Sequence, residues 1–132
     1  HTAFGERRSL YDMVTVAEQL DEAAQVSAVA YIQAQRARED LRTRMLAQMH
    51  GYDGLLMPTT RVAAPKSEEV DNYFLVLSQN CILWSFIGFP VVSVPCGWTS
   101  NGLPVGAQLV TGPNEDDRLL ALAAALEAKI GE

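Results

Sequence analysis

The sequence contains few of the residues from which covalent scaffolds and most catalytic centres are built. Its 132 residues include two cysteines, two histidines and two lysines. Two cysteines, Cys81 and Cys96, are too few to hold a fold together by disulfides, so we expect both to be small core residues in a reducing compartment. With a hydrophobic content of 48%, this composition predicts an ordinary globular protein of the cytoplasm.

Long apolar runs are also missing. The longest covers residues 81–94, is interrupted by a glycine and a proline, and falls short of the roughly 18 residues that span a bilayer. Residues 1–10 are polar and lack the apolar core of a secretory signal. We therefore expect no membrane partner. The chain begins at His1 rather than at Met, which favours a piece of a longer protein.

Positive charge is scarce in the second half of the chain. The formal net charge is −6, and residues 51–132, with nine acidic and four basic side chains, carry almost all of it. A phosphate-binding surface needs clustered Lys and Arg, so this distribution argues against nucleic acid as a partner.

The first 60 residues predict a long helical segment followed by a short strand. Residues 9–50 have helical periodicity, and Asp21 or Ser27 could cap a second helix within them. Gly51 is a typical helix terminator. Residues 55–57 form an apolar run between a glycine and a proline, which is typical of a buried strand.

A second helix is predicted to begin at Ser67 and to end at Gly88. Two glutamates follow Ser67, where the helix dipole favours acidic side chains. Beyond Asn80 this helix is apolar on nearly every face, which predicts a buried helix with Trp84 and Phe86 in the core.

The last third predicts a β-hairpin. Residues 91–94 form a β-branched run that should end at Pro95, and residues 103–111 alternate well enough to be the return strand. Between them, Asn101-Gly102 is the usual signal for a type I′ turn. Trp98, beside the turn, is expected to be half-exposed.

A closing helix completes the predicted α/β fold, in which helices cover a short mixed sheet. Asn114 is the expected N-cap, with Asp117 at the capping-box position. The core face of this helix is expected to contain Leu119, Leu120, Leu122, Ala123 and Leu126.

The residues alone offer no complete active site. No cluster has the spacing of a metal site, and His50, the one non-terminal histidine, stands at a helix end. A serine activated by lysine needs a buried lysine, whereas Lys66 and Lys129 are expected to be solvated. No Gly-rich loop is present to bind a phosphate, so neither a metal nor another cofactor is expected.

Two smaller features have a structural and a functional interpretation. Arg38 and Arg42 stand four residues apart, which is usual for a solvated helix face and less often marks an anion site. Cys96 follows a strand-ending proline and could be a reactive thiol, although a packed structural cysteine is the favoured interpretation.

Three motifs follow one another in an unusual order. Residues 52–60 read YDGLLMPTT, residues 88–97 read GFPVVSVPCG, and residues 102–108 read GLPVGAQ. They resemble the C-terminal portion of the amidase signature family. There a strand ending in Pro-Thr, a G-x-P-x-x-S-x-P segment and a G-L-P-x-G-x-Q hairpin recur in that order. The resemblance covers residues 27–130.

This resemblance implies that residues 1–132 are a single α/β unit and an incomplete amidase domain, helical over 1–50 and strand–helix–hairpin–helix over 51–132. Family members hydrolyse amide bonds of small molecules through a Ser-Ser-Lys triad. The triad belongs to the N-terminal half, so no catalytic residue carries over to this chain. The chain would supply part of the sheet and a wall of the substrate pocket, formed by Thr59, Thr60, Cys81 and Trp84.

Two alternatives remain open. Glutamyl-tRNA amidotransferase subunits of the same family carry an acid ten residues before the glycine that matches Gly88, and this chain has Ser78 there. Ser85 also stands where many members have Asn. A stand-alone amidase is therefore the favoured parent, ahead of an amidotransferase subunit or a non-catalytic scaffold. A sheet cut from a larger one would expose an edge and an apolar face, so we expect self-association, such as a homodimer through the sheet edge.

Overall fold

The N-terminal helical segment is divided at Ser27. The computed structural model describes residue 7 and residues 14–130. Helix α2 spans Val14–Ala24, and α3 spans Ala28–Met49. The Ser27 hydroxyl accepts a hydrogen bond from the Ala30 amide at 3.1 Å and so caps α3, which confirms the predicted split. The predicted helical residues 9–13 lie outside the described residues.

The chain divides into two compact units inside α3. The first comprises residues 1–37, and the second comprises residues 38–132. In the second unit, Met49 at the end of α3 is buried, and Leu41 and Met45 pack against the same core. Gly51 follows with a φ of 86°, a left-handed conformation that terminates the helix as predicted.

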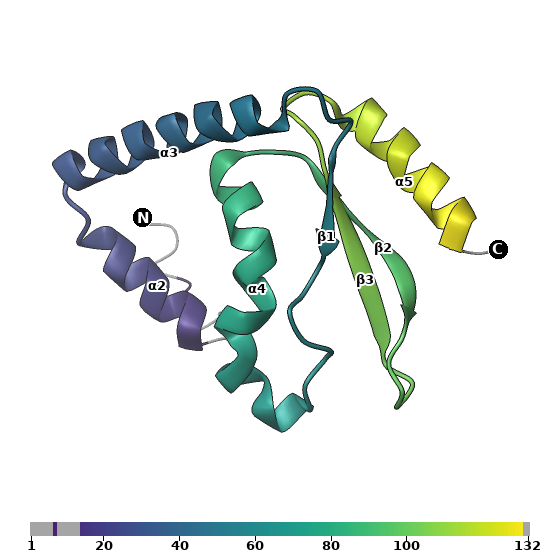
Figure 1. The fold of residues 1–132 in the computed structure, drawn as a ribbon. Helices are drawn as coiled ribbons and strands as arrows, with labels where there is room; N and C mark the ends of the chain where they lie inside the picture. The colour runs from purple at the N-terminus through teal and green to yellow at the C-terminus, as the bar shows by residue number, and fades with distance from the viewer. Residues whose placement is uncertain (1–6, 8–13, 131–132) are drawn as a thin grey trace. The chain divides into compact units, whose positions relative to one another are not determined.

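The rest of the second unit is a sheet with one helix on each face (Figure 1). Its elements are β1 (Leu55–Pro58), a 3-10 turn (Ser67–Glu69), α4 (Val70–Ile87), β2 (Val91–Trp98), β3 (Pro104–Val110) and α5 (Asp116–Ile130). The three strands are antiparallel in the order β1–β3–β2. Leu109 in the central strand is paired with Leu56 of β1 and with Val92 of β2. The predicted α/β fold is confirmed.

Alternation along β3 separates two hydrophobic cores. Val110 packs with Trp84 of α4 on one face, and Leu109 packs with Leu119 of α5 on the other. Successive strand residues point to opposite faces, so a single central strand contributes to both cores. The helices α4 and α5 are held on opposite sides of the sheet by this alternation (Figure 1).

The prediction that α4 is buried on nearly every face is wrong for this chain. Trp84 is 3% exposed, but Phe86, two residues later, is 44% exposed. One side of the helix faces the sheet, and within the described residues its opposite side has no such cover. The reason is that apolar periodicity reports what a helix buries in its complete setting, not which part of that setting a chain contains.

The hairpin forms, but two of its details differ from the prediction. Strand β2 continues through Pro95, where the register shifts between Pro95 and Gly97, because a bulge absorbs the missing proline N–H. At the turn, Gly102 has a φ of 80° whereas Asn101 does not have a positive φ. The Gly102 amide donates to the Thr99 carbonyl at 3.0 Å, which indicates a three-residue loop rather than a type I′ turn. Trp98 is exposed rather than half-exposed.

Helix α5 begins later than predicted. Asn114 has a φ of 63° and lies in the preceding turn, so it is not the N-cap, and the helix starts at Asp116. The Glu115 carboxylate accepts a hydrogen bond from the Gly112 amide at 3.0 Å. Of the predicted core face, Leu120 is wrong, because its side chain is 60% exposed.

Candidate functional site

Polar groups from all three strands meet where β1 ends. The Thr59 amide donates to the Gly106 carbonyl at 2.9 Å, which carries the β1–β3 ladder one residue further. The Thr59 and Ser93 hydroxyl oxygens are 2.6 Å apart and share a hydrogen bond. Ser93 is exposed and Thr59 is half-buried, so this hydroxyl pair opens to the α4 face of the sheet.

Gly106 makes this close approach possible. A Cβ atom at this position would lie 2.8 Å from Ser93 Oγ and 3.0 Å from Thr59 Oγ1, which is closer than real contacts allow. The glycine therefore has a packing reason here rather than a conformational one. Its side-chain face is the space that the two hydroxyls occupy.

A second group of polar contacts ties α4 to the same strand end. The Asn80 side-chain amide donates to the Pro58 carbonyl at 2.9 Å, and the Gln108 amide donates to the Asn80 carbonyl at 2.8 Å. The Cys81 thiol lies 3.6 Å from the Thr59 carbonyl oxygen and 3.8 Å from Gln108 Oε1. Because Gln108 is 1% exposed, these bonds satisfy a buried side chain as well as position the helix.

Two of the four predicted wall residues are therefore in contact, and the other two lie apart from them. Thr60 turns away to donate to the Val62 carbonyl at 2.7 Å. Trp84 is in the core, with its ring stacked on Phe89 at a centroid distance of 6.2 Å. Sequence reasoning missed Ser93, Asn80 and Gln108 as partners. The two-residue spacing of Gly106 and Gln108, which puts both on one face of β3, could have indicated part of this cluster.

Thr60 borders a cavity of about 530 Å³ beside the hairpin. The cavity is lined by Leu56, Met57, Pro58, Thr60, Arg61, Val62, Ala63, Cys96, Thr99, Val105, Gly106 and Ala107. Cys96 is exposed here, with its thiol 3.6 Å from the Val105 carbonyl oxygen. The prediction that Cys96 is a packed core residue is wrong, because the bulge in β2 displaces it from the regular alternation.

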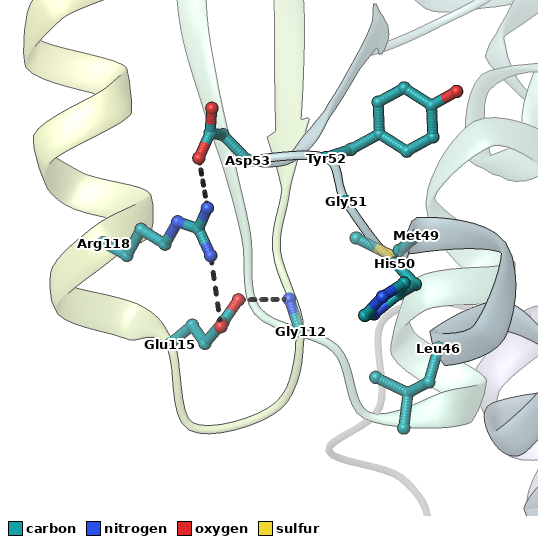
Figure 2. Close-up of a pocket in the computed structure, with 9 residues that line it drawn as sticks. All are labelled: Leu46, Met49, His50, Gly51, Tyr52, Asp53, Gly112, Glu115 and Arg118. Atoms are coloured by element: carbon teal, nitrogen blue, oxygen red, sulfur yellow. Dashed lines mark hydrogen bonds and ion pairs between the residues drawn. The ribbon is translucent and has the colours of Figure 1, made fainter.

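Figure 2 shows a smaller cleft of about 210 Å³ between the end of α3 and the start of α5. Arg118 of α5 lies between two carboxylates and forms ion pairs with Asp53 and with Glu115. The hydrogen bond with Asp53 raises the pKa of Arg118 above its ordinary value. This clasp joins α5 to the turn before β1. Asp53 and Arg118 are 65 residues apart, and nothing in the sequence indicates that they meet.

The pair Arg38 and Arg42 lies against the C-terminal end of α4. Arg42 Nη1 is 3.5 Å from the Ile87 carbonyl oxygen, and a Cβ at Gly88 would lie 3.3 Å from Arg38 Nη2. Both side chains are half-buried, so the interpretation as a solvated helix face is wrong. Carbonyl groups at a helix C-terminus attract cations, which accounts for both arginines without a bound anion.

The described residues do not bring a base to this polar cluster. Thr59, Ser93 and Cys81 contact hydroxyl, carbonyl and amide groups, none of which can activate a nucleophile. His50 and Lys66 are exposed. Within residues 14–130, no group of three His, Cys, Asp or Glu side chains is placed to hold a metal ion. No helix in the described part of the chain is long and apolar enough to cross a membrane.

Comparison with known proteins identifies the origin of this arrangement. A family model described as Amidase matches residues 6–120. A putative amidase AmiA2 of Mycobacterium tuberculosis is 36% identical over 87 residues, which are 60% of this chain and 18% of the relative. A glutamyl-tRNA(Gln) amidotransferase subunit of Myxococcus xanthus is 35% identical over 100 residues, which are 74% of this chain and 21% of the relative.

The fold gives the same answer. The crystal structure of an amidase superimposes on 97% of this chain with a TM-score of 0.74 and 28% identity, and the match covers 31% of that amidase. The chain thus spans about a fifth of the curated relatives that it matches and under a third of this solved one. The family match over residues 6–120 shows that this chain belongs to the amidase family.

Proposed function

We propose that this chain is the C-terminal portion of an amidase that hydrolyses the carbon–nitrogen bond of small-molecule amides. The nucleophile and base, a Ser-Ser-Lys triad, come from the N-terminal portion of the enzyme. In this proposal residues 1–132 are an incomplete amidase domain that contributes part of the sheet and of the pocket wall. The chain by itself is inactive, and neither a cofactor nor nucleic acid takes part.

One observation carries the proposal. The chain matches an amidase model along most of its length but spans only about a fifth of its curated relatives. The described residues agree with this, because the hydroxyls at the end of β1 have no base beside them. An amidase needs a nucleophile and a proton acceptor within hydrogen-bond reach of each other.

The pocket wall in this proposal has a polar and an apolar part. Thr59 and Cys81 supply the polar part at the end of β1, where the Thr59 hydroxyl is held by Ser93. Thr60 borders the neighbouring cavity, and Trp84 supports the wall from inside the core. A small amide has both an apolar body and a polar group, and this combination suits it.

An amidotransferase subunit is the second candidate, because relatives of that name match a larger share of this chain than AmiA2 does. Ser78 argues against it, since the resemblance places an acid at this position in those subunits. Its hydroxyl instead donates to the Leu75 carbonyl at 3.3 Å. A non-catalytic scaffold is the third candidate. It requires a reading frame that starts near residue 1 and encodes no amidase segment upstream.

Ammonia release separates these candidates. The purified 132-residue chain and the product of the full reading frame are incubated with acetamide, benzamide, hexanamide and glutamine. We expect release by the longer product alone, which would also be cytoplasmic. Release from glutamine that requires a co-purified partner protein would favour the amidotransferase, and turnover by the 132-residue chain would refute the proposal.

A further inference from the structure

The face of α4 that points away from the sheet is apolar. We define the α4 outer face as Leu75, Ile82 and Phe86, which are 69%, 50% and 44% exposed. At 100° per residue, these three side chains fall on one side of the helix. The opposite side contains Trp84 and Ile87, which are buried against the sheet. Three large apolar side chains on one helix face form a patch rather than scattered exposed residues.

This face also lacks charge. Asp71 is the one charged residue in the sequence of α4, so residues 72–87 contain no Asp, Glu, Lys or Arg. Helix α5, on the other face of the sheet, differs: its exposed residues include Asp117, Glu127 and Lys129. The cores of protein interfaces are depleted of charged residues, whereas solvent-facing helices are not. The contrast indicates that α5 faces water and α4 faces protein.

The strand edges are poor alternatives for association. Strand β1 has four residues and ends in Pro58, which has no N–H to donate. Strand β2 contains Pro95 and a bulge between Pro95 and Gly97. Short strands, prolines and bulges are features that prevent edge-to-edge pairing. A second copy paired along the sheet edge, as expected from the sequence, is therefore disfavoured on physical grounds.

We propose that the α4 outer face is the surface on which the N-terminal portion of the same amidase packs. The inference rests on the proposed function. It commits to an uncharged, apolar surface of that portion as the occupant, because curated relatives extend about five times the matched length. A segment of that size is available to cover the helix, and burial of the three side chains would stabilise the joined domain.

Substitution of one exposed residue on each helix tests this. Ile82→Glu is made in the 132-residue chain and in the full-length product, with Leu120→Glu on α5 as the matched control. Thermal unfolding is the readout. In the 132-residue chain we expect both variants to stay within about 2 °C of the parent. In the full-length product we expect Ile82→Glu to lower Tm by at least about 5 °C, because the carboxylate is buried there. Leu120→Glu should have little effect there.

If full-length Ile82→Glu does not fold, Ile82→Ala replaces it and should lower Tm by at least about 2 °C in the full-length product alone. An unchanged Tm for Ile82→Glu in the full-length product overturns the inference. So does a reading frame that encodes no further segment, or dimers of the 132-residue chain that Ile82→Glu dissociates. The test needs no catalysis: a full-length product that is inactive yet destabilised by Ile82→Glu would refute the proposed function and support this interface.

Discussion

Gly106→Ala tests whether the strand end at the candidate site is packed as closely as the structure indicates. The new Cβ would lie 2.8 Å from Ser93 Oγ and 3.0 Å from Thr59 Oγ1, so at least one hydroxyl must move. Overpacking of this kind costs about 1–3 kcal/mol. Loss of the exposed hydroxyl pair adds about 0.5 kcal/mol. The lower entropy of the unfolded chain returns about 0.4–1 kcal/mol. We expect a net loss of about 1–2 kcal/mol.

Ser93→Ala provides the rescue that makes the prediction specific. It removes the nearer of the two contacts, so Gly106→Ala/Ser93→Ala should be more stable than the sum of the single variants by about 1 kcal/mol. Gly102→Ala is the control. It also has a cost, because Gly102 has a φ of 80°, but no atom lies within 4 Å of its added Cβ, so Ser93→Ala should not rescue it.

Urea unfolding followed by the fluorescence of the buried Trp84 gives the free energies of unfolding. A Gly106→Ala variant as stable as the parent would contradict the packing described here. Strict additivity of Gly106→Ala and Ser93→Ala would also contradict it, because the clash would then not involve the Ser93 hydroxyl.

Three further substitutions have clear expected outcomes. Gly88→Ala should cost about 1–2 kcal/mol in urea unfolding, because Gly88 has a φ of 72° and the added Cβ would press on Arg38; wild-type stability would contradict this. Trp84→Ala should cost about 3–5 kcal/mol and Phe86→Ala about 1 kcal/mol or less in this chain, so equal losses would refute the assigned burial. Arg118→Gln should lower Tm slightly at low salt and not at about 1 M NaCl, where exposed ion pairs are screened; a loss that persists at high salt would show a different role.

Local signals in the sequence were enough to predict most elements. Ser27, Gly51 and Gly88 each act through their own backbone or a hydrogen bond a few residues away, and each ends or begins a helix where predicted. The same is true of the hairpin, whose sequence specifies a tight turn. Its turn type was not predictable, because Asn101 can adopt either sign of φ and the strand register selects one.

Contacts between distant segments could not be predicted. The Asp53–Arg118 clasp and the Thr59–Ser93 pair join residues that no local pattern relates. Exposure of Phe86 was missed for a different reason: its apolar neighbours indicate a buried helix, and this chain does not contain what would cover it. The resemblance led to Thr59 and Cys81, which the structure brings into contact.

The central claim is that this chain needs the other portion of an amidase in order to act. The most direct measurement is ammonia release from a panel of simple amides by the 132-residue chain and by the full-length product at equal molarity. We expect no release above the buffer blank for the 132-residue chain and steady release for the full-length product. Steady release by the 132-residue chain, or none by the full-length product with any amide, would contradict the account.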